Sequence, residues 1–223
     1  MIIGDRLEFV FIHNPKCAGT ALRSVLMPFD TTGNLFWMHD TCNGHKIDKA
    51  HMPLFLLKQR FPEYFGLLSR YLTFMAVRNP FTRAISAFNE THQELYVAYA
   101  GGESLSRYRY ELNRFFEDLT ESEINGWSFA HRHFVRQADF CFLGRKRYVD
   151  ITLRCESLVE DVAKVGLFAP DLAAALATVP QTHQRPIGHR PAELLNHLAV
   201  KRIVDLYDRD FALFGYSRSP LTA

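Results

Sequence analysis

The chain has 223 residues, of which 48% are hydrophobic and 22% are charged. This composition is typical of a folded globular protein and excludes disorder, collagen-like repeats and a coiled coil as descriptions of the whole chain. The formal net charge of +2, from 26 basic and 24 acidic residues, does not indicate a nucleic-acid-binding protein, although it leaves room for a local anion site. The length predicts a single domain over residues 1–223.

Local features of the sequence exclude further classes of protein. No apolar run approaches the roughly 18 residues of a membrane-spanning helix, and Met1–Glu8 lacks the apolar core of a signal peptide. The cysteines are widely spaced and form no CxxC pair, so we expect free thiols in a reducing compartment and no zinc ribbon. These cysteines are Cys17, Cys42, Cys141 and Cys155.

Strand and helix signals alternate along the chain. Short apolar runs predict buried strands, helical periodicity and capping residues predict helices, and Pro and Gly mark loops. In chain order, the predicted elements are a strand at Leu7–Ile12, a helix at Ala21–Met27, a loop over residues 28–50, a helix at Pro53–Phe61, a strand at Leu72–Val77, helices at Phe81–Tyr99, Tyr108–Leu119 and Trp127–Gln137, a strand at Tyr148–Leu153, a helix at Ser157–Val165, a loop at Pro180–Pro191 and a helix at Ala192–Phe214.

This alternation predicts an α/β fold with a mostly parallel sheet and helices on both faces. In such sheets, ligands bind beyond the carboxyl ends of the strands. A polar segment follows each of the first two predicted strands, His13–Thr20 after the first and Arg78–Arg83 after the second. We therefore treat the two segments as halves of one site.

The first segment contains a candidate phosphate-binding loop, Asn14–Thr20. Its small residues let backbone N–H groups approach an anion, and the helix that follows adds its positive end. Lys16 comes three residues before Gly19 instead of directly after it, so this is not a Walker A loop, and no acidic motif for Mg²⁺ stands out. A metal-dependent NTP hydrolase is therefore disfavoured. The alternative is a purely structural strand-to-helix turn.

The second segment pairs Arg78, at the end of a predicted strand, with Ser86, eight residues on and two turns into the next helix. A guanidinium fork and a hydroxyl at these positions can converge on one phosphate. The alternative is that Arg78 forms an ion pair and Ser86 only fills space.

Together the two segments resemble a known family. FIHNPKCAGTAL, residues 11–22, is similar to the 5′-phosphosulfate loop of sulfotransferases that use 3′-phosphoadenosine 5′-phosphosulfate (PAPS), and AVRNPFTRAISAF, residues 76–88, is similar to their 3′-phosphate motif. The likeness is greatest to carbohydrate sulfotransferases of the heparan, dermatan and chondroitin type. VDITLRCESLVEDVAKVG, residues 149–166, and LYDRDFALFGYS, residues 206–217, give weaker support.

The resemblance implies a P-loop-like fold and a role for each matched residue. Lys16 is expected to contact the sulfate-bearing bridge and stabilise charge on the leaving phosphate, and Arg78 and Ser86 to bind the 3′-phosphate. Arg185, in a loop that would cover the nucleotide, is a further candidate. The residues expected to bind the 5′-phosphate, largely through backbone, are Cys17, Ala18, Gly19, Thr20 and Ala21. Cys17 and Ala21 stand where the family commonly has Thr and Ser, so side-chain hydroxyls are lost there.

The expected reaction moves a sulfuryl group from PAPS to an acceptor hydroxyl, releases 3′,5′-ADP and needs no metal. In-line transfer depends mainly on positioning and electrostatics, but the acceptor hydroxyl needs a base. Of the ten histidines, we favour His51, because it lies at a predicted helix start that disfavours the imidazolium form. In HMPLF it also matches a family position where a His acts as base. His45 is the alternative base, and His13 is a ligand contact or a structural residue.

The acceptor is expected to be a carbohydrate, held by a mainly helical insertion at about residues 101–147. Aromatic rings stack on sugars and arginines bind acidic groups, although a solvated helical face over the core explains these residues equally well. The candidate side chains are Tyr108, Arg109, Arg114, Arg132 and Arg136, with His131 and His133 as further lining residues.

Two other functions fit the same scaffold. One is a nucleoside-kinase-like phosphotransferase, against which the position of Lys16 counts. The other is a non-catalytic nucleotide-binding protein, against which the combination of Lys16, Arg78, Ser86 and a base candidate counts. The sequence favours a cytoplasmic enzyme, such as a bacterial one, over the trimmed luminal domain of a membrane-anchored enzyme, which commonly carries disulfides.

Overall fold

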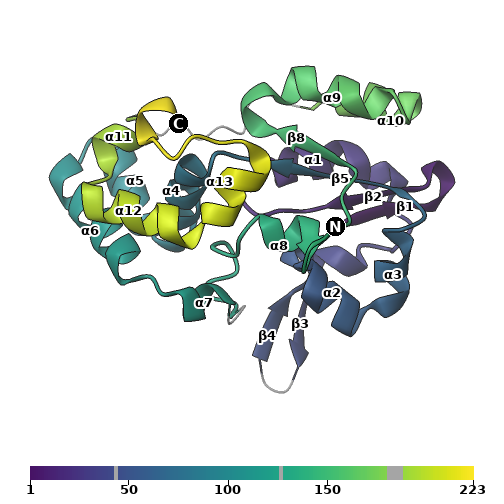
Figure 1. Cartoon of the computed structure of the whole chain (residues 1–223), viewed down its shortest axis with the longest axis horizontal. Coiled ribbons are helices and arrows are strands. Elements are labelled where there is room, and N and C mark those ends of the chain that lie inside the picture. The colour runs from purple at the N-terminus through teal and green to yellow at the C-terminus, as the bar shows by residue number, and fades with distance from the viewer. Residues whose placement is uncertain (43–44, 126–127, 180–187) are drawn as a thin grey trace. The chain divides into compact units, whose positions relative to one another are not determined.

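The computed structural model describes residues 1–42, 45–125, 128–179 and 188–223 (Figure 1). The chain packs as two compact units, Met1–Arg78 with Gln137–Gln184, and Asn79–Arg136 with Arg185–Ala223. Residues 101–136 belong to the second unit and residues 137–147 to the first. None of the helices in the described ranges has the length and hydrophobicity that crossing a bilayer requires.

The first unit is built on a four-stranded sheet in the order β1-β2-β5-β8. Strand β2 pairs in parallel with β5, and β5 in parallel with β8, whereas β1 pairs antiparallel with β2. The sheet is therefore mixed, with a parallel core and one antiparallel edge strand that the sequence analysis missed because it is only three residues long. The strands are β1 (Ile2–Gly4), β2 (Phe9–Ile12), β5 (Leu72–Val77) and β8 (Ile151–Arg154).

Both faces of this sheet are covered by helices. Phe9 and Phe11 point to one face of β2 and Val10 and Ile12 to the other, and all four are at most 2% exposed. In Figure 1, α1 (Gly19–Leu26), α9 (Leu158–Gly166) and α10 (Pro170–Leu176) lie on one side of the sheet, and α2 (Leu54–Arg60), α3 (Pro62–Leu67) and α8 (Ala138–Cys141) lie on the other. The expected arrangement of helices on both faces is confirmed for this unit.

Residues 28–50, expected to be a loop, contain regular structure. Strands β3 (His39–Cys42) and β4 (His45–Asp48) form an antiparallel hairpin. A second small hairpin joins β6 (Phe142–Leu143) to β7 (Lys146–Arg147). The 3-10 helices are η1 (Asp5–Leu7), η2 (Met27–Phe29), η3 (Leu35–Trp37), η4 (Lys49–His51), η5 (Cys155–Ser157) and η7 (Pro220–Thr222). The first of these shortens the strand expected at Leu7–Ile12.

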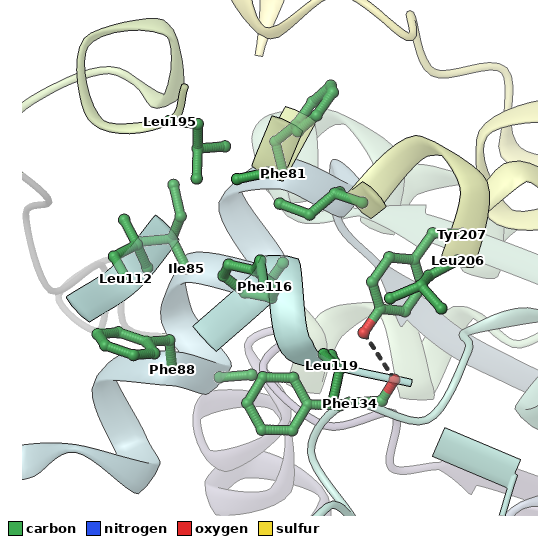
Figure 2. Packing of buried hydrophobic residues seen from close by; sticks show 14 of the residues in the cluster. Phe81, Ile85, Phe88, Leu112, Phe116, Leu119, Phe134, Leu195, Leu206 and Tyr207 are labelled. Carbon is green, nitrogen blue, oxygen red and sulfur yellow. Dashed lines mark hydrogen bonds between the residues drawn. The ribbon is translucent and has the colours of Figure 1, made fainter. Parts of the chain in front are cut away.

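In its described residues, the second unit is made of helices around one apolar core (Figure 2). Phe81 packs against Phe211 at a ring-centroid distance of 5.1 Å, and the Tyr207 hydroxyl donates a 2.8 Å hydrogen bond to the carbonyl oxygen of Phe134. The helices are α4 (Pro80–Thr91), α5 (Gln93–Ala100), α6 (Leu105–Asp118), α7 (Glu121–Asn125), α11 (Pro191–Leu194), α12 (His197–Leu206) and α13 (Asp208–Phe214).

Three predicted helices of this unit differ from the structure. The helix expected at Phe81–Tyr99 is interrupted at His92, and the C-terminal helix is divided into α11, α12 and α13. The part of Trp127–Gln137 that is described forms turns instead of a helix. Hydrophobic periodicity does not reveal these breaks, because apolar residues continue on both sides of them.

Candidate active site

The phosphate loop joins the end of β2 to the start of α1. Lys16 and Ala18 both have left-handed backbones, with φ of 63° and 55°. Non-glycine residues hold this conformation at a cost of about 1–3 kcal/mol, so the surrounding structure enforces it. Successive residues of alternating handedness turn their N–H groups to one side and make an anion-binding concavity. The left-handed backbone at Lys16 and Ala18 is compatible with an anion-binding loop.

Alternate residues of the loop face in opposite directions. The side chains of Lys16 and Ala18 are partly exposed and Thr20 is exposed, whereas Cys17 and Gly19 are buried. Ala21, which follows in α1, is also buried. The Cys17 side chain is therefore directed into the protein, and any contact it makes with a ligand in front of the loop is through its backbone.

Three buried side chains hold the loop from behind. The Asn14 amide nitrogen lies 3.0 Å from the carbonyl oxygen of Ala76 in β5 and 3.1 Å from both Cys17 Sγ and Gln137 Oε1. The Cys17 thiol lies 3.3 Å from the same Gln137 oxygen. The Cys17 sulfur therefore takes part in hydrogen bonds inside the protein and not at the ligand.

Gln137 also binds the second candidate segment. Its Oε1 accepts a 2.9 Å hydrogen bond from the N–H of Arg78, and its Nε2 donates a 2.8 Å hydrogen bond to the Arg78 carbonyl oxygen. The Arg78 guanidinium in turn donates a 3.4 Å hydrogen bond to the carbonyl oxygen of Lys16. Arg78 and Lys16 are thus neighbours in the folded protein, as expected from their strand-end positions.

His13 is a structural part of the loop. Its ring stacks on Trp37, at a centroid distance of 6.0 Å and an interplanar angle of 4°, and it packs so closely on Gly19 that a Cβ there would overlap it. His13 is 5% exposed. Gly19 is therefore needed because an aromatic ring fills the space that any other side chain would take.

His51 ends η4, whose N-cap is Asp48, and its ring meets the His13 ring edge-on at 4.4 Å. The His51 Nδ1 atom lies 3.1 Å from the His13 carbonyl oxygen. A carbonyl oxygen only accepts hydrogen bonds, so Nδ1 carries the proton and, in the neutral ring, Nε2 is the basic nitrogen. This is the tautomer that a general base requires at Nε2.

The two thiols nearest the loop interact. A hydrogen bond with Cys17, together with burial, raises the pKa of the Cys155 thiol well above its usual value. Cys17, Cys141 and Cys155 are free thiols in the described residues. Cys155 lies directly after β8, so the carboxyl ends of β2, β5 and β8 all contribute residues to this region.

Three candidates remain. Ser86 lies half-buried on α4 of the second unit, whereas Arg78 belongs to the first. Arg185 falls outside the described residues. His45 begins β4, and nothing is described of its side chain.

Several residues expected at an acceptor wall are held in structural contacts within the second unit. Tyr108 is fully buried and donates a 2.6 Å hydrogen bond to Asn89 Oδ1. Arg136 binds Glu121 and the carbonyl oxygen of Leu206. These contacts hold both side chains in the packing of the second unit.

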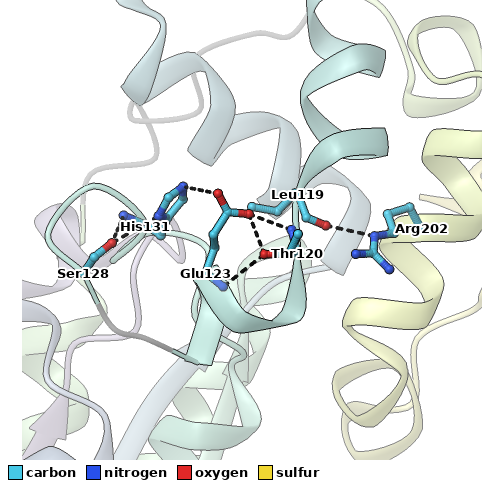
Figure 3. A network of polar contacts seen from close by, with 6 residues as sticks. All are labelled: Leu119, Thr120, Glu123, Ser128, His131 and Arg202. Atoms are coloured by element: carbon cyan, nitrogen blue, oxygen red, sulfur yellow. Dashed lines mark hydrogen bonds and ion pairs between the residues drawn. The ribbon is translucent and has the colours of Figure 1, made fainter.

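His131 belongs to the network drawn in Figure 3. Its Nε2 lies 3.7 Å from Glu123 Oε1, and its Nδ1 lies 3.1 Å from the Ser128 hydroxyl. Glu123 and Thr120 exchange the hydrogen bonds of a capping box at the start of α7. Hydrogen bonds from the N–H and hydroxyl of Thr120 hold the pKa of Glu123 below its usual range. This network accounts for His131 without a ligand.

A family model of the sulfotransferase family matches residues 1–217. The chain belongs to the sulfotransferase family. No curated protein and no solved structure matches this sulfotransferase significantly. The family's chemistry is sulfuryl transfer.

Two buried residues of this site, Asn14 as an anchor and Gln137, are not predicted by the sequence. Gln137 is 0% exposed and lies 123 residues from Asn14 along the chain. Neither residue belongs to a spacing pattern that indicates a role, and the sequence predicts that Gln137 ends a helix.

Proposed function

We propose that this sulfotransferase moves the sulfuryl group of PAPS to a hydroxyl group of a carbohydrate acceptor and releases 3′,5′-ADP, without a metal ion. The observation that carries the proposal is the arrangement of Lys16, Arg78 and His51 around one loop: the Arg78 guanidinium binds the carbonyl oxygen of Lys16, and the His51 ring binds that of His13. A P-loop-like mode of phosphate binding is part of the proposal.

In this proposal, the backbone N–H groups of residues 17–21, at the positive end of α1, bind the 5′-phosphate of PAPS. The left-handed backbone at Lys16 and Ala18 supports this assignment. Lys16 stabilises the negative charge that develops on the leaving phosphate. Arg78 and Ser86 bind the 3′-phosphate, and Arg185 contributes to the cover over the nucleotide.

In the transfer step, the acceptor oxygen attacks sulfur and forms the new S–O bond. The S–O bond to the phosphate of PAPS breaks, and the electron pair leaves with 3′,5′-ADP. The acceptor proton goes to Nε2 of His51, which the hydrogen bond at Nδ1 keeps unprotonated in the neutral ring. Positioning and charge stabilisation supply the rest of the catalysis.

A carbohydrate acceptor is supported by cavities within the second unit. One, of about 750 Å³, is lined by Glu103, Ser104, Arg107 and Tyr108 of the 101–147 segment together with residues of α4 and α5. Its lining combines carboxylates, a guanidinium and hydroxyl groups, which are the groups that hydrogen-bond to sugars.

The first test is calorimetric titration of the whole protein with 3′,5′-ADP in EDTA, beside ADP and ATP. We expect binding of 3′,5′-ADP in preference to both, and loss of that preference in Arg78→Ala. Arg70→Ala is the matched control, because Arg70 is an exposed arginine beside the opposite end of the same strand. Equal binding of all three nucleotides, or a requirement for Mg²⁺, would overturn the proposal in favour of a kinase-like activity.

A further inference from the structure

Gln137 is the buried junction between the two phosphate-binding segments. Its Oε1 accepts from the N–H of Arg78 and lies within 3.1 Å of the Asn14 amide nitrogen, and its Nε2 donates to the Arg78 carbonyl oxygen. Arg78 is the first residue after β5, and Asn14 lies two residues after β2. One amide thus ties together the ends of two neighbouring parallel strands, where the backbone ladder of the sheet has stopped.

This junction leaves little freedom at either segment. The Gln137 side chain binds both the donor and the acceptor of the Arg78 main chain, as a neighbouring strand would. Losing one of these hydrogen bonds is costly in a buried site, because no water is present to replace the lost partner. Gln137 therefore holds the Arg78 main chain next to the loop, beside the hydrogen bond that Asn14 donates to the carbonyl oxygen of Ala76.

We propose that Gln137 is a positioning residue that sets the spacing between the 5′-phosphate and 3′-phosphate subsites. This rests on the proposed function, in which the loop takes one phosphate and Arg78 the other. A ligand with both phosphates binds more tightly than a ligand with one only if the distance between the two subsites matches the distance between its phosphates. The second phosphate then meets its subsite at a high effective concentration. Gln137 touches neither phosphate; it acts through Arg78, Asn14 and Cys17.

A purely structural role makes a different prediction. If Gln137 only stabilised the fold, its loss would weaken all nucleotides alike or none of them. A spacing role predicts a selective effect: 5′-AMP, which uses the loop alone, keeps its affinity, and 3′,5′-ADP loses the gain from its second phosphate. The ratio of the two affinities is therefore the quantity to measure.

The experiment titrates wild type, Gln137→Met and Gln137→Glu with 3′,5′-ADP and with 5′-AMP, and follows thermal unfolding of each protein. Met keeps the length of Gln without its hydrogen bonds. We expect the affinity ratio to fall by about tenfold or more in Gln137→Met, while 5′-AMP binding changes by less than about threefold.

In Gln137→Glu, lowering the pH should restore the affinity ratio, which a purely structural role does not predict. The carboxylate cannot donate to the Arg78 carbonyl oxygen, but the protonated carboxyl group restores both a donor and an acceptor of the same shape. We expect its affinity ratio to recover toward that of the wild type, measured at the same pH, as the pH is lowered. This variant also decides the matter if Gln137→Met fails to fold.

Asn113→Leu is the matched control. Asn113 is a buried amide of the second unit that donates to the carbonyl oxygens of Arg109 and Leu194, so its loss lowers the stability of that unit. We expect an unchanged affinity ratio in this variant. An unchanged ratio in folded Gln137 variants would overturn the positioning role alone, whereas a wild type that binds both nucleotides equally would overturn the proposed function and this inference with it.

Discussion

The Nδ1 atom of His51 lies 3.1 Å from the carbonyl oxygen of His13, the residue that leads into the phosphate loop. The bond orients the imidazole and assigns its proton to Nδ1, so the basic nitrogen is Nε2. The candidate base and the candidate donor loop are therefore connected by one hydrogen bond, although the two residues are 38 positions apart.

Replacement of His51 tests its role as base. We expect His51→Ala to bind 3′,5′-ADP as the wild type does and to lose transfer activity by about 10²–10⁴-fold, because general-base catalysis contributes that much. Transfer is measured with labelled PAPS over a panel of carbohydrate acceptors. His45→Ala is the parallel variant, and loss of transfer there with full activity in His51→Ala would move the base to His45.

The contact between Gly19 and His13 predicts a compensating pair of substitutions. In Gly19→Ala the new Cβ would overlap the His13 ring, which Trp37 holds in place by stacking. We expect a lower unfolding temperature and weaker 3′,5′-ADP binding, since overpacking of a buried site costs about 1–3 kcal/mol.

The double variant His13→Ala, Gly19→Ala tests whether overlap with the His13 ring causes the loss of stability in Gly19→Ala. Removing the ring opens the space that the methyl group needs, so part of the lost stability should return relative to the sum of the two single variants. Additive losses would show that the overlap is not what makes residue 19 a glycine.

The raised pKa of the Cys155 thiol predicts slow alkylation. The hydrogen bond with Cys17, followed by burial, is its main cause. Because only the thiolate reacts, we expect Cys155 to react more slowly with iodoacetamide at pH 8.5 than a free thiol, and faster in Cys17→Ala. Mass spectrometry locates the label, and Cys141→Ala is the control. Equal rates in wild type and Cys17→Ala would contradict the interaction.

Asp161 is expected to make a contribution to the stability of the fold that depends on pH. Burial by itself raises the pKa of this carboxyl, but the N–H of Arg154 at 2.7 Å, the Lys164 ammonium at 2.8 Å and the Ser157 hydroxyl outweigh it and hold the pKa below the usual 3.8. A lowered folded-state pKa gives stability that is present above pH 3.8 and is lost as the pH falls through the folded-state value.

We expect Asp161→Asn to lower the free energy of unfolding at pH 7 by about 1.5–3 kcal/mol, the usual worth of hydrogen bonds to a charged group. The difference from wild type should shrink as the pH is lowered below 3.8. Urea unfolding at pH 7 and at acid pH measures both values. A difference that is constant with pH would show that the charge of Asp161 is not the cause.

Local patterns predicted the elements that carry a strong apolar signal. The strand at Leu72–Val77 has the predicted bounds, because a strand buried on both faces is a continuous apolar run. The hairpin of β3 and β4 was missed, since its sequences HDTC and HKID are mostly polar and show no such run. Strand β1 was too short to register.

The amino-acid sequence specifies the groups available for chemistry: a strand, a loop of small residues with one lysine, a helix, and an arginine after the next strand. How those groups are used depends on the folded chain. It turned the Cys17 side chain inward, assigned the His51 proton through the His13 carbonyl, and brought Gln137 between Asn14 and Arg78. Spacing along a chain encodes local conformation and burial, whereas the partner of a buried amide depends on which distant segment the fold returns to it.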